Sequence, residues 1–148
     1  MRVLFDTNVV LDVLLERAPH ASAATLLFEH VARRNLEGLL GATTVTTIHY
    51  LAAKAVGTKK ARRHLQTLLS LFEVAPVSRA VLTDALALGW SDFEDAVLLE
   101  AARNARADGL VTRDPAGFKS SRLRVYAPDE LLSLLTVAPT ARENGKPQ

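Results

Sequence analysis

The sequence contains no cysteine. A disulfide framework, a thiol nucleophile and a thiolate metal site are therefore excluded, and the absence fits a reducing cytoplasm. No apolar run approaches the ~20 residues that a membrane span requires. The first residues also form a strand-like apolar pattern instead of a charged leader with a cleavage site. We therefore expect a soluble, cytoplasmic protein that does not associate with a membrane.

Aromatic residues are also scarce, at 5% of the chain, and no ladder of rings for stacking single-stranded bases is visible. The remaining composition, 49% hydrophobic and 23% charged over 148 residues, is typical of one globular domain. We place that domain at residues 1–135 and expect 136–148 to be a polar, disordered tail. A net charge of +2 and a pI near 9.2 permit a polyanionic partner without requiring one.

Short apolar runs alternate with longer segments whose apolar residues recur at helical spacing. Such runs are typical of strands buried on both faces of a parallel sheet. We therefore predict an α/β protein, a three-layer α/β/α sandwich around a mainly parallel sheet of about five strands. The pattern does not give the strand order. The predicted strands are residues 3–5, 39–42, 72–75, 110–112 and 123–126.

Acidic residues follow two of these strands. Asp6 ends the first strand and Asp114 follows the fourth, so both are expected at the edge of the sheet where ligands bind in open α/β folds. The pattern Ser91-x-x-Glu94 predicts a capping box at the start of a helix, and Asp92 and Asp95 fall in its first turn. Taken singly, each acid also has a structural explanation as a helix cap or a turn residue.

The convergence of these acids favours a metal site over separate structural roles. Asp95 shares a helix face with residues that point inward, where a carboxylate is costly to bury unless a cation or a donor meets it. Hard oxygen ligands without cysteine or clustered histidine indicate Mg²⁺ or Mn²⁺. Such ions activate water and bind phosphate oxygens during phosphodiester hydrolysis.

Three short motifs, in this order and spacing, are similar to a known family: Asp-Thr-Asn at 6–8, Asp-Phe-Glu-Asp-Ala at 92–96, and Val-Thr-Arg-Asp-Pro at 111–115 followed by Phe118. The chain resembles the PIN-domain ribonucleases, most like the VapC-type toxins of bacterial type II toxin–antitoxin pairs, from Met1 to about Leu135. The resemblance implies a homodimeric endoribonuclease that cuts RNA with Mg²⁺ or Mn²⁺ and is silenced by a cognate antitoxin protein.

The resemblance also assigns residues. It implies that Asp6, Asp95 and Asp114 are the catalytic, metal-binding acids, and Asp92 is a further candidate ligand from the same edge. The supporting polar residues around them would be Thr7, Asn8 and Thr112. Asp12, more than a turn into the first helix, is expected to lie farther away and is a weaker candidate.

One position departs from the family pattern, because His49 stands where the family usually has a glutamate. A neutral imidazole can bind a metal or accept a proton, but it brings no negative charge to hold Mg²⁺. His49 is therefore either a supporting residue of the site or a partly buried structural histidine. The departure also favours an alternative function, a catalytically degenerate PIN domain that binds RNA or a protein without cutting.

Basic residues near the third motif and at the start of one helix are candidates for binding the RNA backbone. A solvated helix face is the simpler explanation of the second group. Two other functions stay open on this fold. A phosphatase with Asp6 as nucleophile prefers a second acid where Asn8 stands, and a receiver-type phosphate acceptor prefers paired acids after the first strand, where only Asp6 is present. The candidate substrate-binding residues are Arg113, Lys119, Arg122, Lys59 and Lys60.

Overall fold

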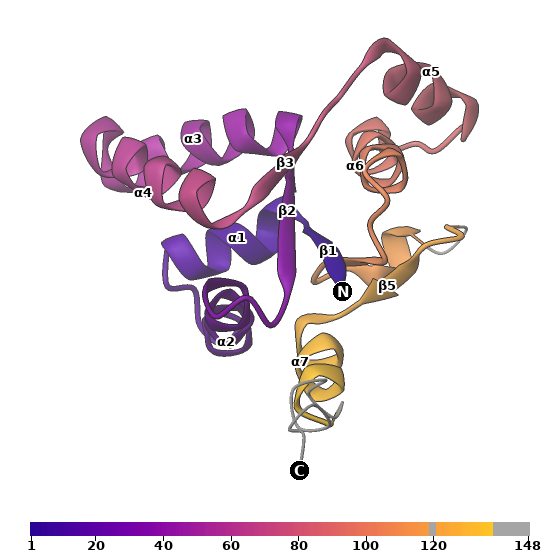
Figure 1. The fold of residues 1–148 in the computed structure, drawn as a ribbon. Helices are drawn as coiled ribbons and strands as arrows, with labels where there is room; N and C mark the ends of the chain where they lie inside the picture. The colour runs from indigo at the N-terminus through magenta and orange to yellow at the C-terminus, as the bar shows by residue number, and fades with distance from the viewer. Residues whose placement is uncertain (119–120, 138–148) are drawn as a thin grey trace.

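The computed structural model describes residues 1–118 and 121–137, and Figure 1 shows the arrangement of its elements. Five strands form one sheet in the order β3-β2-β1-β4-β5, and every neighbouring pair is parallel. All five strands lie within two residues of their predicted positions, and the prediction of a mainly parallel sheet is confirmed. The strands are β1 (Arg2–Phe5), β2 (Glu37–Gly41), β3 (Glu73–Ala75), β4 (Gly109–Val111) and β5 (Arg124–Tyr126).

Helices connect the strands and cover both faces of the sheet. The last helix continues to Val137, two residues beyond the predicted domain boundary, and the rest of the predicted tail, 138–148, lies outside the described residues. The helices are α1 (Thr7–Leu14), α2 (Ala21–Ala32), α3 (Ala42–Val56), α4 (Thr58–Leu71), α5 (Arg79–Ala87), α6 (Phe93–Asn104) and α7 (Pro128–Val137), with a 3₁₀ turn, η1, at Pro115–Phe118.

Alternate residues of each strand feed two separate cores. Phe5 and Leu40 pack with α1, α2, α3, α4 and α7, whereas Leu4 and Leu39 face α5 and α6 on the other side. In Figure 1 the first group of helices and the pair α5 and α6 lie on opposite sides of the sheet. This arrangement is the predicted three-layer sandwich.

A cluster of three rings fixes the first core beneath the central strands. Phe5, Phe28 and Phe72 meet edge to face, with ring centroids 5.1 to 5.8 Å apart. Phe72 also explains why β2 carries a glycine, because a Cβ on Gly38 would lie 2.6 Å from its ring. The packing holds β1 and β2 in the register that directs their carboxyl ends to one edge.

No helix within 1–118 and 121–137 combines the length and the apolar character needed to cross a membrane.

Candidate active site

Asp6 leaves the carboxyl end of β1 and is the N-cap of α1. Its Oδ1 accepts a hydrogen bond of 2.7 Å from the backbone N–H of Thr7. Its backbone N–H donates to the carbonyl of Val111 on β4 at 2.9 Å, so the strand pairing holds the residue as well as the cap. The capping role and the functional role considered for Asp6 are therefore compatible, because the cap uses only one of the two carboxylate oxygens.

The second oxygen of Asp6 receives a hydrogen bond from a buried threonine on the neighbouring strand end. Thr112 Oγ1 donates to Asp6 Oδ2 at 2.8 Å and accepts from the backbone N–H of Asp114 at 3.1 Å. The amide of Asn8 lies 3.5 Å from both Asp6 Oδ2 and Thr112 Oγ1, and its carbonyl oxygen accepts from the N–H of Arg113 at 3.3 Å. The expected supporting residues Asn8 and Thr112 thus join the ends of β1 and β4, and Thr7 reaches Thr44 on α3 at 3.4 Å between the two hydroxyls.

Asp92 and Asp95 enter the same edge from α6. The helix begins one residue later than the predicted capping box requires, with Asp92 as the N-cap accepting from the N–H of Asp95 at 3.1 Å. The prediction of Ser91 as the cap is therefore wrong. Aspartate caps a helix as well as serine does, and Asp92 accepts from the N–H three residues later, that of Asp95. The shift leaves Asp92 exposed at the mouth of the site and Asp95 half-buried behind it.

The carboxyl groups repel one another. Burial raises the pKa of Asp6 above its usual value, and the charges of Asp92 and Asp114 add to the rise, although hydrogen bonds from Thr112 and Thr7 oppose it. Burial likewise raises the pKa of Asp95 to about 7, with further contributions from the charge of Asp6 and from the charge and hydrogen bond of Asp92. At both residues burial is the largest cause of the shift and neighbouring negative charges add to it, which is the pattern of clustered acids.

Asp114 closes the cluster across a small turn. The position that a Cβ on Gly117 would occupy lies 3.4 Å from Asp114 Oδ2 and 3.5 Å from Asp95 Oδ2, so these two oxygens flank the same glycine. Together with Asp92 and Trp90 they line an open cleft of about 410 Å³. The structure thus brings together the four acids Asp6, Asp92, Asp95 and Asp114 that the sequence singled out.

The donor chemistry of this cluster fits a hard divalent cation, because carboxylate oxygens in a partly buried, mutually repulsive group gain most from one. The described side chains do not, however, form a complete coordination site. Within residues 1–118 and 121–137, no three His, Asp or Glu side chains lie close enough together to hold a metal ion. The cluster therefore offers ligands that a bound ion would still have to draw inward.

Asp12 lies in a second polar cluster beside the site. Its side chain is 1% exposed, and its Oδ1 accepts a 2.8 Å hydrogen bond from Arg17 Nε. Its Oδ2 forms an ion pair with Arg113 Nε at 2.8 Å, but this contact lacks the alignment of a hydrogen bond. Arg17 also donates to the backbone carbonyl of Asn8 at 3.2 Å. Sequence spacing gave no sign of this cluster, because its members are separated by up to 101 residues along the chain.

His49 does not join the acids. It is half-buried in a groove of about 320 Å³ between α3 and α4, lined with it by Arg62, Leu65, Gln66 and Leu69. The buried stripe of α3 is formed by Thr44, Ile48 and Ala52. His49 follows Ile48, so it points about 100° farther round the helix than the face that meets the sheet.

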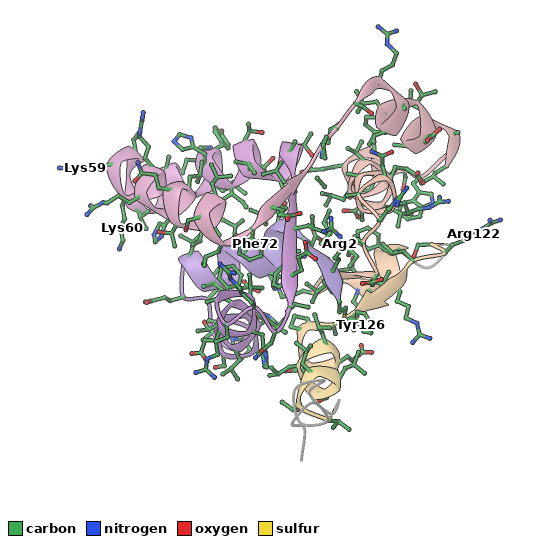
Figure 2. All side chains as sticks on the ribbon, in the orientation of Figure 1. Arg2, Lys59, Lys60, Phe72, Arg122 and Tyr126 are labelled. Carbon is green, nitrogen blue, oxygen red and sulfur yellow. The ribbon has the colours of Figure 1, made fainter. Side chains whose placement is uncertain are left out.

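The candidate RNA-binding cations are dispersed. Figure 2 shows Lys59 and Lys60 at the outer end of α4 and Arg122 on the opposite side of the sheet. Arg113 lies beside the acids, but its Nε is paired with Asp12, and Lys119 lies outside the described residues. A larger cavity, of about 550 Å³ and mostly apolar, lies away from the acids between α1, α2, α3 and α4.

Comparison with known proteins gives a family and several relatives. A sequence profile of the family described as "PIN domain" matches residues 2–116. Ribonuclease VapC1 of Aquifex aeolicus (strain VF5) is 22% identical over 134 residues, which are 87% of this chain and 92% of that protein.

Solved structures show the same architecture. A chain of a toxin–antitoxin complex from Klebsiella pneumoniae matches with a TM-score of 0.65 at 23% identity, covering 85% of this chain and 97% of that one. A chain of VapBC2 from Rickettsia felis, bound to a DNA fragment from its promoter, matches with a TM-score of 0.66 at 18% identity, covering 86% and 98%. At these identities the likeness confirms the fold.

Proposed function

This chain belongs to the PIN-domain family, as its motifs predicted, and from that membership we propose that it is a metal-dependent endoribonuclease, the toxin of a type II toxin–antitoxin pair. The names of its relatives support the proposal, since they include a ribonuclease VapC1 and chains of toxin–antitoxin complexes. The observation that carries it is the convergence of four carboxyl groups at the carboxyl end of β1 and β4. The phosphatase and the phosphate acceptor considered above assign no role to the acids at the start of α6, Asp92 and Asp95.

Each residue of the cluster has a proposed role. Asp6, Asp95 and Asp114 hold Mg²⁺ or Mn²⁺, and Asp92 assists them from the mouth of the cleft. Thr112 orients Asp6 through its 2.8 Å hydrogen bond and holds the backbone of Asp114 through its oxygen. A bound ion supplies an activated water and neutralises charge on the phosphodiester.

Around that ion, the protein's own contribution is positioning. The cap at Thr7 and the amide of Asn8 fix the carboxyl group of Asp6 against β4, so its orientation is set before an ion binds. The open cleft admits a phosphate, and Gly117 keeps the space between Asp95 and Asp114 free of a side chain. A phosphate in the cleft would belong to the backbone of RNA, the proposed substrate.

The test compares wild-type protein with Asp95→Asn, which keeps the side-chain shape and removes the charge. Wild-type protein should cleave RNA in Mn²⁺ and lose activity in EDTA, and Asp95→Asn should be inactive. Mn²⁺ should also raise the melting temperature of the wild type and leave that of the variant unchanged, because a ligand of the native state stabilises it by mass action. Equal cleavage by both proteins would refute the assignment of the acid.

We also propose an antitoxin partner and a homodimer. Expression of the chain alone should arrest bacterial growth, and coexpression of a cognate antitoxin should relieve the arrest, whereas Asp95→Asn should permit growth. A sedimentation measurement at micromolar concentration should give twice the mass of 16.1 kDa.

The second candidate is a degenerate PIN domain that binds RNA or a protein without cutting. It is favoured by the absence of a finished three-ligand group among the described side chains and by His49 in place of an acid. RNA binding without cleavage, and with no Mn²⁺ effect on the melting temperature, would select it.

A further inference from the structure

The single tryptophan of the chain stands in the wall of the acid cleft. Trp90 precedes Asp92 by two residues and lines the same cavity as Asp95, Asp114 and Gly117. Gly89, in the left-handed conformation at φ 68°, turns the chain out of α5 and into this position. A large aromatic surface thus lies beside the carboxyl groups, although the protein is poor in aromatic residues.

Packing fixes the indole and buries it only in part. Its ring meets Phe118 edge to face, with centroids 5.8 Å apart and planes at 76°. Phe118 is 2% exposed, whereas Trp90 is only partly buried against the second core. The edge-to-face contact with Phe118 covers at most one face of the indole, and the part of the ring that stays exposed lines the cleft.

The other parts of the cleft are small or charged. Ala116 and Gly117 leave room beside the acids, and the volume of about 410 Å³ falls in the ~300–1,000 Å³ range of ligand pockets. A cavity with carboxylates on one side and one aromatic ring on another suits a ligand that combines a metal-binding anion with a flat ring. A nucleotide within an RNA strand has both.

We propose that Trp90 is a base-stacking subsite, which receives an unstacked base next to the phosphate held at the acids. The inference rests on the proposed ribonuclease function and adds the residue that would contact an unpaired base, since paired bases cannot be turned out to stack on a side chain at little cost. Stacking accepts any base, so the subsite gives a preference for unpaired RNA without a sequence code.

Because Trp90 is the only tryptophan, intrinsic fluorescence reports this subsite alone. Wild-type protein in Mn²⁺ is mixed rapidly with a single-stranded oligoribonucleotide and its emission is read before turnover. The matched probe is an oligomer of abasic spacers with the same length and charge. Quenching by the RNA and not by the abasic oligomer is the expected result. Equal responses to both, or no response to RNA, would overturn the proposal.

Two variants separate stacking from packing. Trp90→Leu should weaken binding of a labelled single-stranded RNA by roughly 5- to 150-fold, whereas Trp90→Phe should retain most of the affinity. The slope of affinity against salt should not change, because no phosphate contact is removed. Tyr50→Leu, on an exposed ring of α3, is the control and should bind RNA as the wild type does.

The outcomes distinguish this inference from the function on which it rests. RNA-specific quenching without any cleavage would leave the subsite standing and refute the ribonuclease proposal. Cleavage with unaltered fluorescence and an unaltered Trp90→Leu affinity would refute the subsite and leave the ribonuclease proposal intact. The wild-type fluorescence measurement holds even if Trp90→Leu fails to fold.

Discussion

The cluster of Asp12, Arg17 and Arg113 makes an asymmetric prediction about stability. The Asp12 side chain is 1% exposed, whereas those of Arg17 and Arg113 are 38% and 31% exposed. Removing the acid leaves two guanidinium groups that can turn to water. Removing both bases leaves a carboxylate in the interior, and an uncompensated buried charge is the more costly defect.

The expected losses follow from that difference. Asp12→Asn keeps the shape of the side chain and should lower the free energy of unfolding by about 1–3 kcal/mol, the cost of unsatisfied buried polar groups. The double variant Arg17→Met/Arg113→Met keeps the aliphatic stems and should lose about 3–5 kcal/mol. Adding Asp12→Asn to the double variant should then recover part of the loss, because it removes the stranded charge.

Urea denaturation followed by circular dichroism measures these free energies. Glu100→Gln is the matched control, since Glu100 is also buried and pairs with one half-exposed arginine, Arg103, away from the acids. The variants at Asp12, Arg17 and Arg113 should speed hydrogen exchange at the N–H groups of Arg113 and Asp114, which donate to Asn8 and Thr112, whereas Glu100→Gln should not. A double variant that is more stable than Asp12→Asn would refute the charge argument.

Three further predictions concern the acids and their neighbours. Folding raises the pKa of Asp95 from 3.8 to about 7, so the unfolded chain releases this proton first as the pH rises. The stability of the metal-free protein should therefore fall as the pH rises from 3.8 to about 7. Melting temperatures measured in EDTA over this pH range should fall less for Asp95→Asn than for the wild type. Gly117→Ala places a methyl group between Asp95 and Asp114 and should reduce the Mn²⁺-induced rise in melting temperature by at least half, while melting in EDTA stays within a few degrees of the wild type. His49→Ala should leave the Mn²⁺ effect unchanged, and its loss in that variant would return His49 to the metal site.

The sequence was sufficient for the strands and for the edge where the acids meet. Buried parallel strands are continuous apolar runs, so 3–5 and 110–112 stand out without any knowledge of their partners. Since parallel strands end at one edge, Asp6 and Asp114 could be paired before the strand order was known. The order itself depends on distant pairings such as Arg2 with Glu37, which leave no local signature.

The wrong cap at Ser91 and the placements that spacing did not predict have one physical origin, which is that a side chain's direction depends on details finer than its spacing. A shift of one residue in the cap moved Asp92 from the first turn of α6 to the N-cap, while Asp95 stayed at the cluster. The turn of α3 carries His49 away from the position that motif alignment gives it. Arg113, adjacent to Asp114 in the chain, points its guanidinium to Asp12.

Compared with the family pattern, α3 carries one acid fewer, because His49 stands where a glutamate is usual. A glutamate on the sheet-facing stripe of α3 would have to replace Thr44 or Ile48, which are 0% exposed and packed against α1 and the sheet. Asp92 instead brings a carboxylate from α6, on the opposite wall and in reach of both Asp6 and Asp95. Under the proposed function, the negative charge offered to a cation would therefore lie toward α6, where Asp92 and Trp90 line the same cleft. A cluster built on that wall would bind its ion beside the indole, which is where a base following the bound phosphate needs a surface on which to stack.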